Sequence, residues 1–89
     1  MAVIDIADVT VRVAATPSGA NIWTFITAAT VDDLDTLDIS TVVKTIYSVS
    51  VLGSTDGLLT AAVSSAGVVT IPGATDNEAR TLFVLGSSQ

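Results

Sequence analysis

The sequence contains no cysteine and no histidine among its 89 residues. Without cysteine the chain can form neither a disulfide nor a thiolate metal site. Without histidine it lacks the commonest metal ligand and the usual acid–base group of enzymes. These absences argue against most catalytic and redox chemistry and favour a protein that works by binding.

Basic residues are scarce as well, with three against nine acidic residues and a formal net charge of −6. Arg12, Lys44 and Arg80 are too few to form a basic patch, so nucleic acid is not an expected partner. The same balance argues against an anionic membrane surface. We therefore expect neither nucleic acid nor membrane among the partners.

No targeting segment is visible in the sequence. The N-terminus has no basic region and reaches Asp5 too early for a signal peptide. Two long uncharged stretches, 13–31 and 57–75, contain proline, glycine and hydroxyl residues instead of running apolar, which is not typical of a membrane span. We expect a chain that is made and used in a cytoplasm-like compartment or assembled from there.

Charged residues make up only 13% of the chain, whereas 49% are hydrophobic. A domain of this size has little margin of stability alone, and small domains usually add disulfides, a metal or a partner. Because cysteine and histidine are missing, oligomerisation is the remaining device. We expect part of the apolar surface to be buried against another chain.

The longest β-type run is 42–52, VVKTIYSVSVL, which we predict to be a long central strand. Side chains alternate across a strand, so one face is half polar and the other is suited to a core. The predicted core face comprises Val43, Thr45, Tyr47, Val49 and Val51. A helix is disfavoured because β-branched and aromatic residues lose rotamer freedom there.

Shorter runs with turn residues between them predict five further strands. They cover residues 7–15, 21–30, 58–64, 68–71 and 80–85; residues 31–41 are predicted as an acidic loop, with or without one helical turn, and 86–89 as a frayed tail. The expected fold class is all-β, a small antiparallel β-sandwich or barrel of about six strands. We predict one domain over residues 1–89, in which residues 1–7 form an arm that pairs with a neighbour or frays.

The only clustered charges are four carboxylates of the acidic loop: Asp32, Asp33, Asp35 and Asp38. A Ca²⁺ site is one interpretation, because hard cations bind several carboxylate oxygens. The spacing lacks the alternating acidic positions and terminal glutamate of an EF-hand loop. A solvated loop is the favoured alternative, and we assign no metal ligand.

Catalytic alternatives find little support in the residues. A carboxylate pair could hydrolyse glycosides, but so short a chain with few polar side chains leaves little room for a sugar cleft. A serine or threonine nucleophile would have only Lys44 as its base, and Lys44 is better explained as guarding a sheet face. We predict a non-enzyme with no catalytic residue and no cofactor.

The aromatic residues are Trp23, Phe25, Tyr47 and Phe83, and all lie in predicted strands. They could stack on bases or sugars. Anchoring a core or an interface is the favoured interpretation, because valine and isoleucine surround them in sequence.

A family resemblance rests on four stretches of this sequence. They are DISTVVKTIYSVSVL at 38–52, VVTIP at 68–72, TDN at 75–77 and TLFVLG at 81–86. Their layout resembles small β-rich virion proteins of tailed bacteriophages, some of which are capsid decoration, or cement, proteins. No site residue is carried over, since such proteins work through surfaces.

The resemblance implies a virion structural protein that is made in the host cytoplasm. It would form homo-oligomers, often trimers, and clamp subunits of the major capsid protein by burying apolar area and extending sheets edge to edge. A phage tail, connector or fibre component is one alternative, and a small carbohydrate- or ligand-binding β-module is another. The surroundings of Trp23 and Tyr47 should separate an interface from a ligand cleft.

Overall fold

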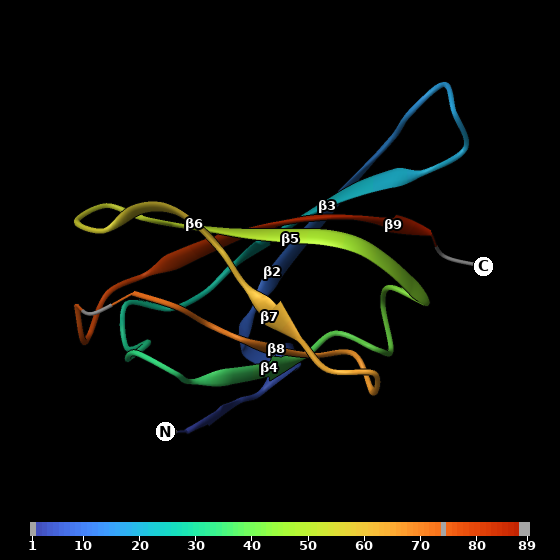
Figure 1. The fold of residues 1–89 in the computed structure, drawn as a ribbon. Coiled ribbons are helices and arrows are strands. Elements are labelled where there is room, and N and C mark those ends of the chain that lie inside the picture. The colour runs from blue at the N-terminus through green and yellow to red at the C-terminus, as the bar shows by residue number, and fades with distance from the viewer. Residues whose placement is uncertain (1, 74, 88–89) are drawn as a thin grey trace.

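The computed structural model describes residues 2–73 and 75–87, which fold into two β-sheets packed face to face (Figure 1). The larger sheet contains, in spatial order, β2 (Thr10–Ala15), β3 (Asn21–Ile26), β9 (Arg80–Ser87), β5 (Thr45–Gly53) and β6 (Gly57–Thr60). The smaller contains β1 (Val3–Ile4), β4 (Thr36–Asp38), β8 (Val68–Thr70) and β7 (Ala62–Val63). The all-β prediction is confirmed, and a small sandwich is its form.

The core lies between the two sheets. In β3 and β9 the alternation expected from the sequence is confirmed, because Trp23 and Phe25 point inward opposite Val84 and Leu82. The smaller sheet and its flanking loops contribute the other half of the core. The buried apolar residues are Val9, Trp23, Phe25, Val31, Leu37, Ile39, Val43, Val49, Val51, Val69, Ile71, Leu82 and Val84.

The predicted central strand is present, but it starts at Thr45 and contains a β-bulge. Its pairing with β9 shifts register between Ile46 and Ser48, so Tyr47 is the extra residue. A bulged residue leaves the two-residue alternation. Tyr47 is therefore 62% exposed while Val49 is buried, and the prediction that Tyr47 lies on the core face is wrong. The same prediction is wrong for Thr45, which precedes the bulge and is exposed.

The predicted strand 58–64 is two strands in different sheets. β6 pairs with β5 as far as Thr60, and the Ala61 N–H donates to the Val49 carbonyl at 3.0 Å. The chain then crosses to the smaller sheet, where β7 pairs with β8. The crossing was not predicted, because a strand that passes from one sheet to the other keeps the same alternation of apolar and polar residues.

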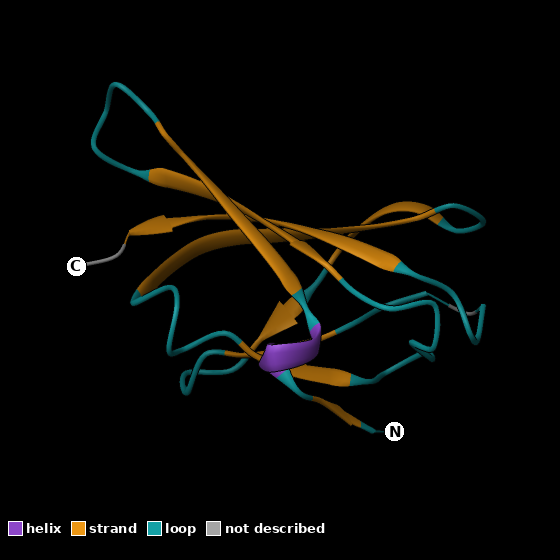
Figure 2. Ribbon diagram, turned by 180° about the vertical axis from the view of Figure 1, so that it is seen from behind, coloured by secondary structure: helices purple, strands orange, loops and turns teal. Residues whose placement is uncertain are grey.

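Two other observed boundaries differ from the prediction, because elements of three residues are too short to show a hydrophobic period. The predicted acidic loop contains β4, a three-residue strand that pairs with both β1 and β8. The predicted strand 7–15 begins instead with the 3-10 helix η1 (Ile6–Asp8), whose cap Asp5 accepts a hydrogen bond from the Ala7 N–H (Figure 2). The described residues thus form nine strands, not about six.

Both ends of the chain are tied to the sheets. Within the predicted arm, β1 pairs in parallel with β4 of its own domain, and Met1 lies outside the described residues. Of the predicted tail, Gly86 and Ser87 belong to β9, and residues 88–89 lie outside the described residues. The β2–β3 hairpin projects from one corner, beyond the smaller sheet (Figure 1).

Candidate interaction surfaces

The outer face of the larger sheet carries an apolar patch, which we call the outer patch. Strand register fixes its members, because residues directly opposite each other in an antiparallel pair point to the same side. Ile22 stands opposite Leu85 in one row, and Ile26 aligns with Leu52 and Leu58 in another, through Thr81. Phe83 lies between the rows. The outer patch comprises Ile22, Ile26, Leu52, Leu58, Phe83 and Leu85, all classed as exposed.

The outer patch is large for a protein of this size. Exposed fractions run from 37% at Ile26 and Leu85 to 63% at Leu58. With about 200 Å² for a fully exposed large residue, the six together expose roughly 500 Å². The largest apolar patch on a typical monomer covers about 300–600 Å² and is often functional. The outer patch is therefore of the size expected for an interaction surface.

The rest of the same face is nearly uncharged. Serine and threonine fill the positions between the apolar residues, and Arg12 on β2 is the one charged residue among the face's strand positions, all of which are described. None of the nine acidic residues occupies these strands' outer positions. Despite the charge of −6, another surface can approach this face with little desolvation of carboxylates.

The sequence predicts part of the side-chain pattern that forms the outer patch. The sequence predicts that Ile22 alternates with Trp23 and that Phe83 alternates with Val84, and the structure confirms this alternation, with Ile22 and Phe83 turned away from the core. Their assembly into one patch with Leu58 was missed, because that depends on which strands are neighbours. No signal in the sequence specifies the order β3-β9-β5-β6.

A groove lies beside β5. It has a volume of about 680 Å³ and runs between the start of β5 and the 64–67 turn. Lys44 and Tyr47 lie on its β5 side, and Ser64 and Ser65 on the other. Trp23, in contrast, is buried in the core between the two sheets. Of the two aromatics expected to discriminate between functions, only Tyr47 is available to a ligand.

The acidic loop is occupied by hydrogen bonds within the chain. The buried Asp35 carboxylate accepts from the N–H groups of Ala2 at 2.8 Å and Asp32 at 2.9 Å. The bond from Asp32 is the main cause that lowers the pKa of Asp35, with Ala2 adding to it and burial opposing it. Across the described ranges, no three potential metal ligands gather around one point.

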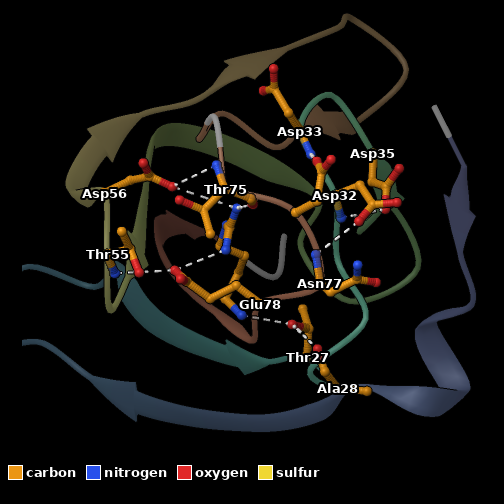
Figure 3. A network of polar contacts seen from close by, with 12 residues as sticks. Thr27, Ala28, Asp32, Asp33, Asp35, Thr55, Asp56, Thr75, Asn77 and Glu78 are labelled. Atoms are coloured by element: carbon orange, nitrogen blue, oxygen red, sulfur yellow. Dashed lines mark hydrogen bonds and ion pairs between the residues drawn. The ribbon is translucent and has the colours of Figure 1, made fainter.

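The other acidic side chains of this loop act on nearby backbone. Asp32 accepts from the Asn77 N–H at 2.9 Å, which ties the loop to the segment before β9 (Figure 3). Asp38 accepts from the Ser40 N–H at 2.9 Å, and hydrogen bonds from Ser40, its hydroxyl first, lower the pKa of Asp38. Asp33 is exposed. The loop carboxylates thus hold segments together.

Arg80 is a buried cation that the sequence did not reveal, since its position reads as an ordinary strand start. Its side chain is 1% exposed, and its Nη1 lies 2.9 Å from Glu78 Oε1. Nη2 donates to the Thr75 carbonyl and lies 3.7 Å from Asp56 Oδ2. The Arg80 N–H donates to Thr27 Oγ1 at 2.8 Å. This cluster joins the β5–β6 turn, the 75–78 loop and the end of β3.

No helix among the described residues is long and apolar enough to cross a membrane. Comparison of the chain with family models, with curated proteins and with solved structures found no match.

Proposed function

We propose that this chain is a non-enzymatic structural protein of a virion, of the capsid decoration type, that attaches to other protein surfaces through its larger sheet. The observation that carries the proposal is the outer patch, an apolar and nearly uncharged surface on an otherwise acidic protein. A clamp of this kind needs a broad contact surface and no reactive site.

The partners follow from the same surface. The major capsid protein covers the outer patch, and further copies of the chain join it around the particle. The trimer implied by the family resemblance is one arrangement of these copies. A phage tail, connector or fibre component would use the outer patch in the same way, so the particle that contains the chain decides between these roles.

The test is co-expression of the chain with the structural genes that flank its own gene, followed by purification of assembled particles by sedimentation. We expect the chain to sediment with capsid particles at a fixed copy number. Phe83→Glu and Leu58→Glu should each lower that copy number at least tenfold, because they bury a charge in the contact. Absence of the chain from the particles would contradict the proposal.

The matched control is Val3→Glu. Val3 is 82% exposed and lies in the smaller sheet, away from the outer patch. This variant should remain on the particles at the wild-type level. Equal loss for Val3→Glu and Phe83→Glu would show that added negative charge, not the outer patch, controls attachment.

A small carbohydrate-binding module is the second candidate, and the groove with Tyr47 favours it. An exposed aromatic ring beside hydroxyl side chains is a common way to hold a sugar. In that case Tyr47→Ala would abolish binding to a glycan array, while Leu58→Glu would leave it intact. No binding by the wild-type chain would remove this candidate.

A further inference from the structure

We propose that two copies of this chain pair through β2, antiparallel and with the Val13 residues opposite each other at a two-fold axis. The pairing joins two larger sheets into one of ten strands. It deepens the proposed function by naming the surface through which copies associate, and it rests on that function only for its biological purpose.

β2 is the one long open edge among the described strands. The other edges are β6 with four residues, and β1 and β7 with two each. β2 has six residues, all exposed, and pairs only with β3. Natural proteins protect such edges with proline, bulges, several charges or short length. β2 has no proline or bulge and carries one charge, Arg12.

Two side chains of β2 that point toward the core side of the larger sheet are left exposed to solvent. Val11 and Val13 stand opposite Phe25 and Trp23 and so share their inward face. The two valines are nevertheless 38% and 60% exposed. The hairpin extends past the smaller sheet (Figure 1). A partner strand at this edge would place its own side chains beside these valines.

The occupant we infer is a second copy, because β2 is self-complementary in one register. A two-fold axis perpendicular to the sheet keeps the same face outward in both copies and pairs residues of equal parity. Near the middle of the strand, the axis can then pass only through Arg12 or Val13. Arg12 would place two guanidinium groups directly opposite each other, which is destabilising.

The register centred on Val13 avoids that conflict. It places Val13 against Val13, Val11 against Ala15, and Arg12 against Ala14. All six strand positions except Thr10 then have a partner within β2. With the exposed valines, such a pair buries on the order of 1,000 Å² in total, the lower bound for a specific interface. No acidic residue lies in β2, so the negative charge of the two copies stays away from the contact.

The absence of native cysteine makes a direct test simple. In the proposed register the two Val13 Cα atoms lie about 4.5–5.5 Å apart, within the range that a disulfide spans. Val13→Cys should therefore form a covalent dimer in high yield under mild oxidation at micromolar concentration. The side chain is mostly exposed, so the substitution should not prevent folding.

Val11→Cys is the matched control. In the same register the two Val11 positions are displaced by four residues along the strands, about 13 Å, which no disulfide can bridge. Val11→Cys alone should stay reduced. A mixture of Val11→Cys with Ala15→Cys should cross-link, because those positions face each other. Equal cross-linking of Val11→Cys and Val13→Cys would indicate random collision and would overturn the register.

The outcomes separate this proposal from the proposed function. If Val13→Cys does not cross-link, the two-fold β2 pair is wrong, whether or not the chain is found on capsids. A trimer in which β2 of one copy meets β6 of the next would give that result. If Val13→Cys cross-links but the chain is absent from particles, the pairing stands and the virion role fails.

Discussion

Arg80 connects three segments that are distant in sequence, and its charge is balanced by two carboxylates. The guanidinium Nη1 lies close to Glu78 and Nη2 lies near Asp56, whose side chains are 11% and 19% exposed. Among the described residues, Nε and Nη1 have no partner with hydrogen-bond geometry. The cluster is thus held by charge more than by directed hydrogen bonds, and it depends on the cation being present.

Replacing Arg80 by methionine should destabilise the fold strongly. The substitution leaves Glu78 and Asp56 without their cation, and breaking a buried ion pair typically costs about 3–5 kcal/mol. We expect a loss of about 3 kcal/mol in the free energy of unfolding, since both carboxylates are partly exposed. Urea unfolding at fixed protein concentration measures it. The control Lys44→Met, at an exposed position, should change it by less than about 0.5 kcal/mol.

The double variant Arg80→Met/Glu78→Gln should recover part of that loss, because it removes one of the unbalanced charges. A loss below about 0.5 kcal/mol for Arg80→Met alone would show that the cluster contributes little to the fold. No recovery in the double variant would show that the unbalanced Glu78 charge is not the cause of the loss.

The lowered pKa of Asp35 predicts that the folded protein becomes less stable in acid. Hydrogen bonds from backbone N–H groups lower its folded-state pKa below the ordinary value of 3.8. A lowered pKa adds stability above the unfolded-state pKa and loses it as pH falls through the folded-state pKa. The free energy of unfolding should therefore decline below about pH 5. Glu78 should act in the same direction, since hydrogen bonds from Thr55, the hydroxyl first, lower its pKa.

Asp35→Asn isolates this contribution. An amide cannot accept both N–H groups as the carboxylate does, so the variant should be less stable at pH 7 and lose less on acidification. Chemical unfolding between pH 7 and pH 3 gives the comparison. If the acid slope of Asp35→Asn equals that of the wild type, Asp35 is not a source of the acid sensitivity.

At the scale of elements, the contact between β5 and β9 depends on Gly86. A Cβ at Gly86 would overlap the Thr45 carbonyl oxygen and lie 2.8 Å from Val43 Cγ1. This close approach occurs where Ile46 pairs with Gly86, next to the bulge at Tyr47. Only glycine fits at position 86 without a steric clash. The position is next to the bulge that exposes Tyr47 at the groove.

Gly86→Ala should lower the free energy of unfolding by about 2 kcal/mol, because the clash of the new Cβ with the Thr45 backbone cannot be relieved by a rotamer change. The restricted unfolded chain would offset less than about 1 kcal/mol of that. Thermal unfolding of Gly86→Ala beside Thr60→Ala, an exposed strand position, makes the measurement. Equal midpoints for the two variants would mean that β5 and β9 can separate at this point without cost.

Regular strands were predicted better from the sequence than bulged or very short ones. The alternation in β3 and β9 was predicted correctly because both strands are regular, but the sequence alone left open which of their faces packs on the core. The bulge at Tyr47 reversed one assignment, since a single extra residue shifts the alternation. Two- and three-residue strands such as β4 are too short to show a period, and their pairing depends on distant segments. Arg80 was missed because its counter-ions come from other loops.

At the scale of the whole molecule, one face of the sandwich is apolar and the acidic groups lie elsewhere. Two copies, each with a formal charge of −6, repel one another at long range. Contact through the outer patch or β2 requires few charges, so salt should screen the repulsion without weakening the contact. We expect self-association to strengthen between about 20 and 500 mM NaCl, as measured by sedimentation velocity. Weaker association in high salt would indicate an interface built on opposite charges.

The most direct test of the central claim, that this chain works by associating through its surfaces, is its solution mass across dilution, measured by light scattering. The monomer mass is 9.0 kDa. We expect an assembly of two copies, or a multiple of two, that persists to about 1 µM. A trimer would keep the surface role and contradict the two-fold β2 pair. A folded monomer at every concentration would contradict the claim that copies of this chain associate.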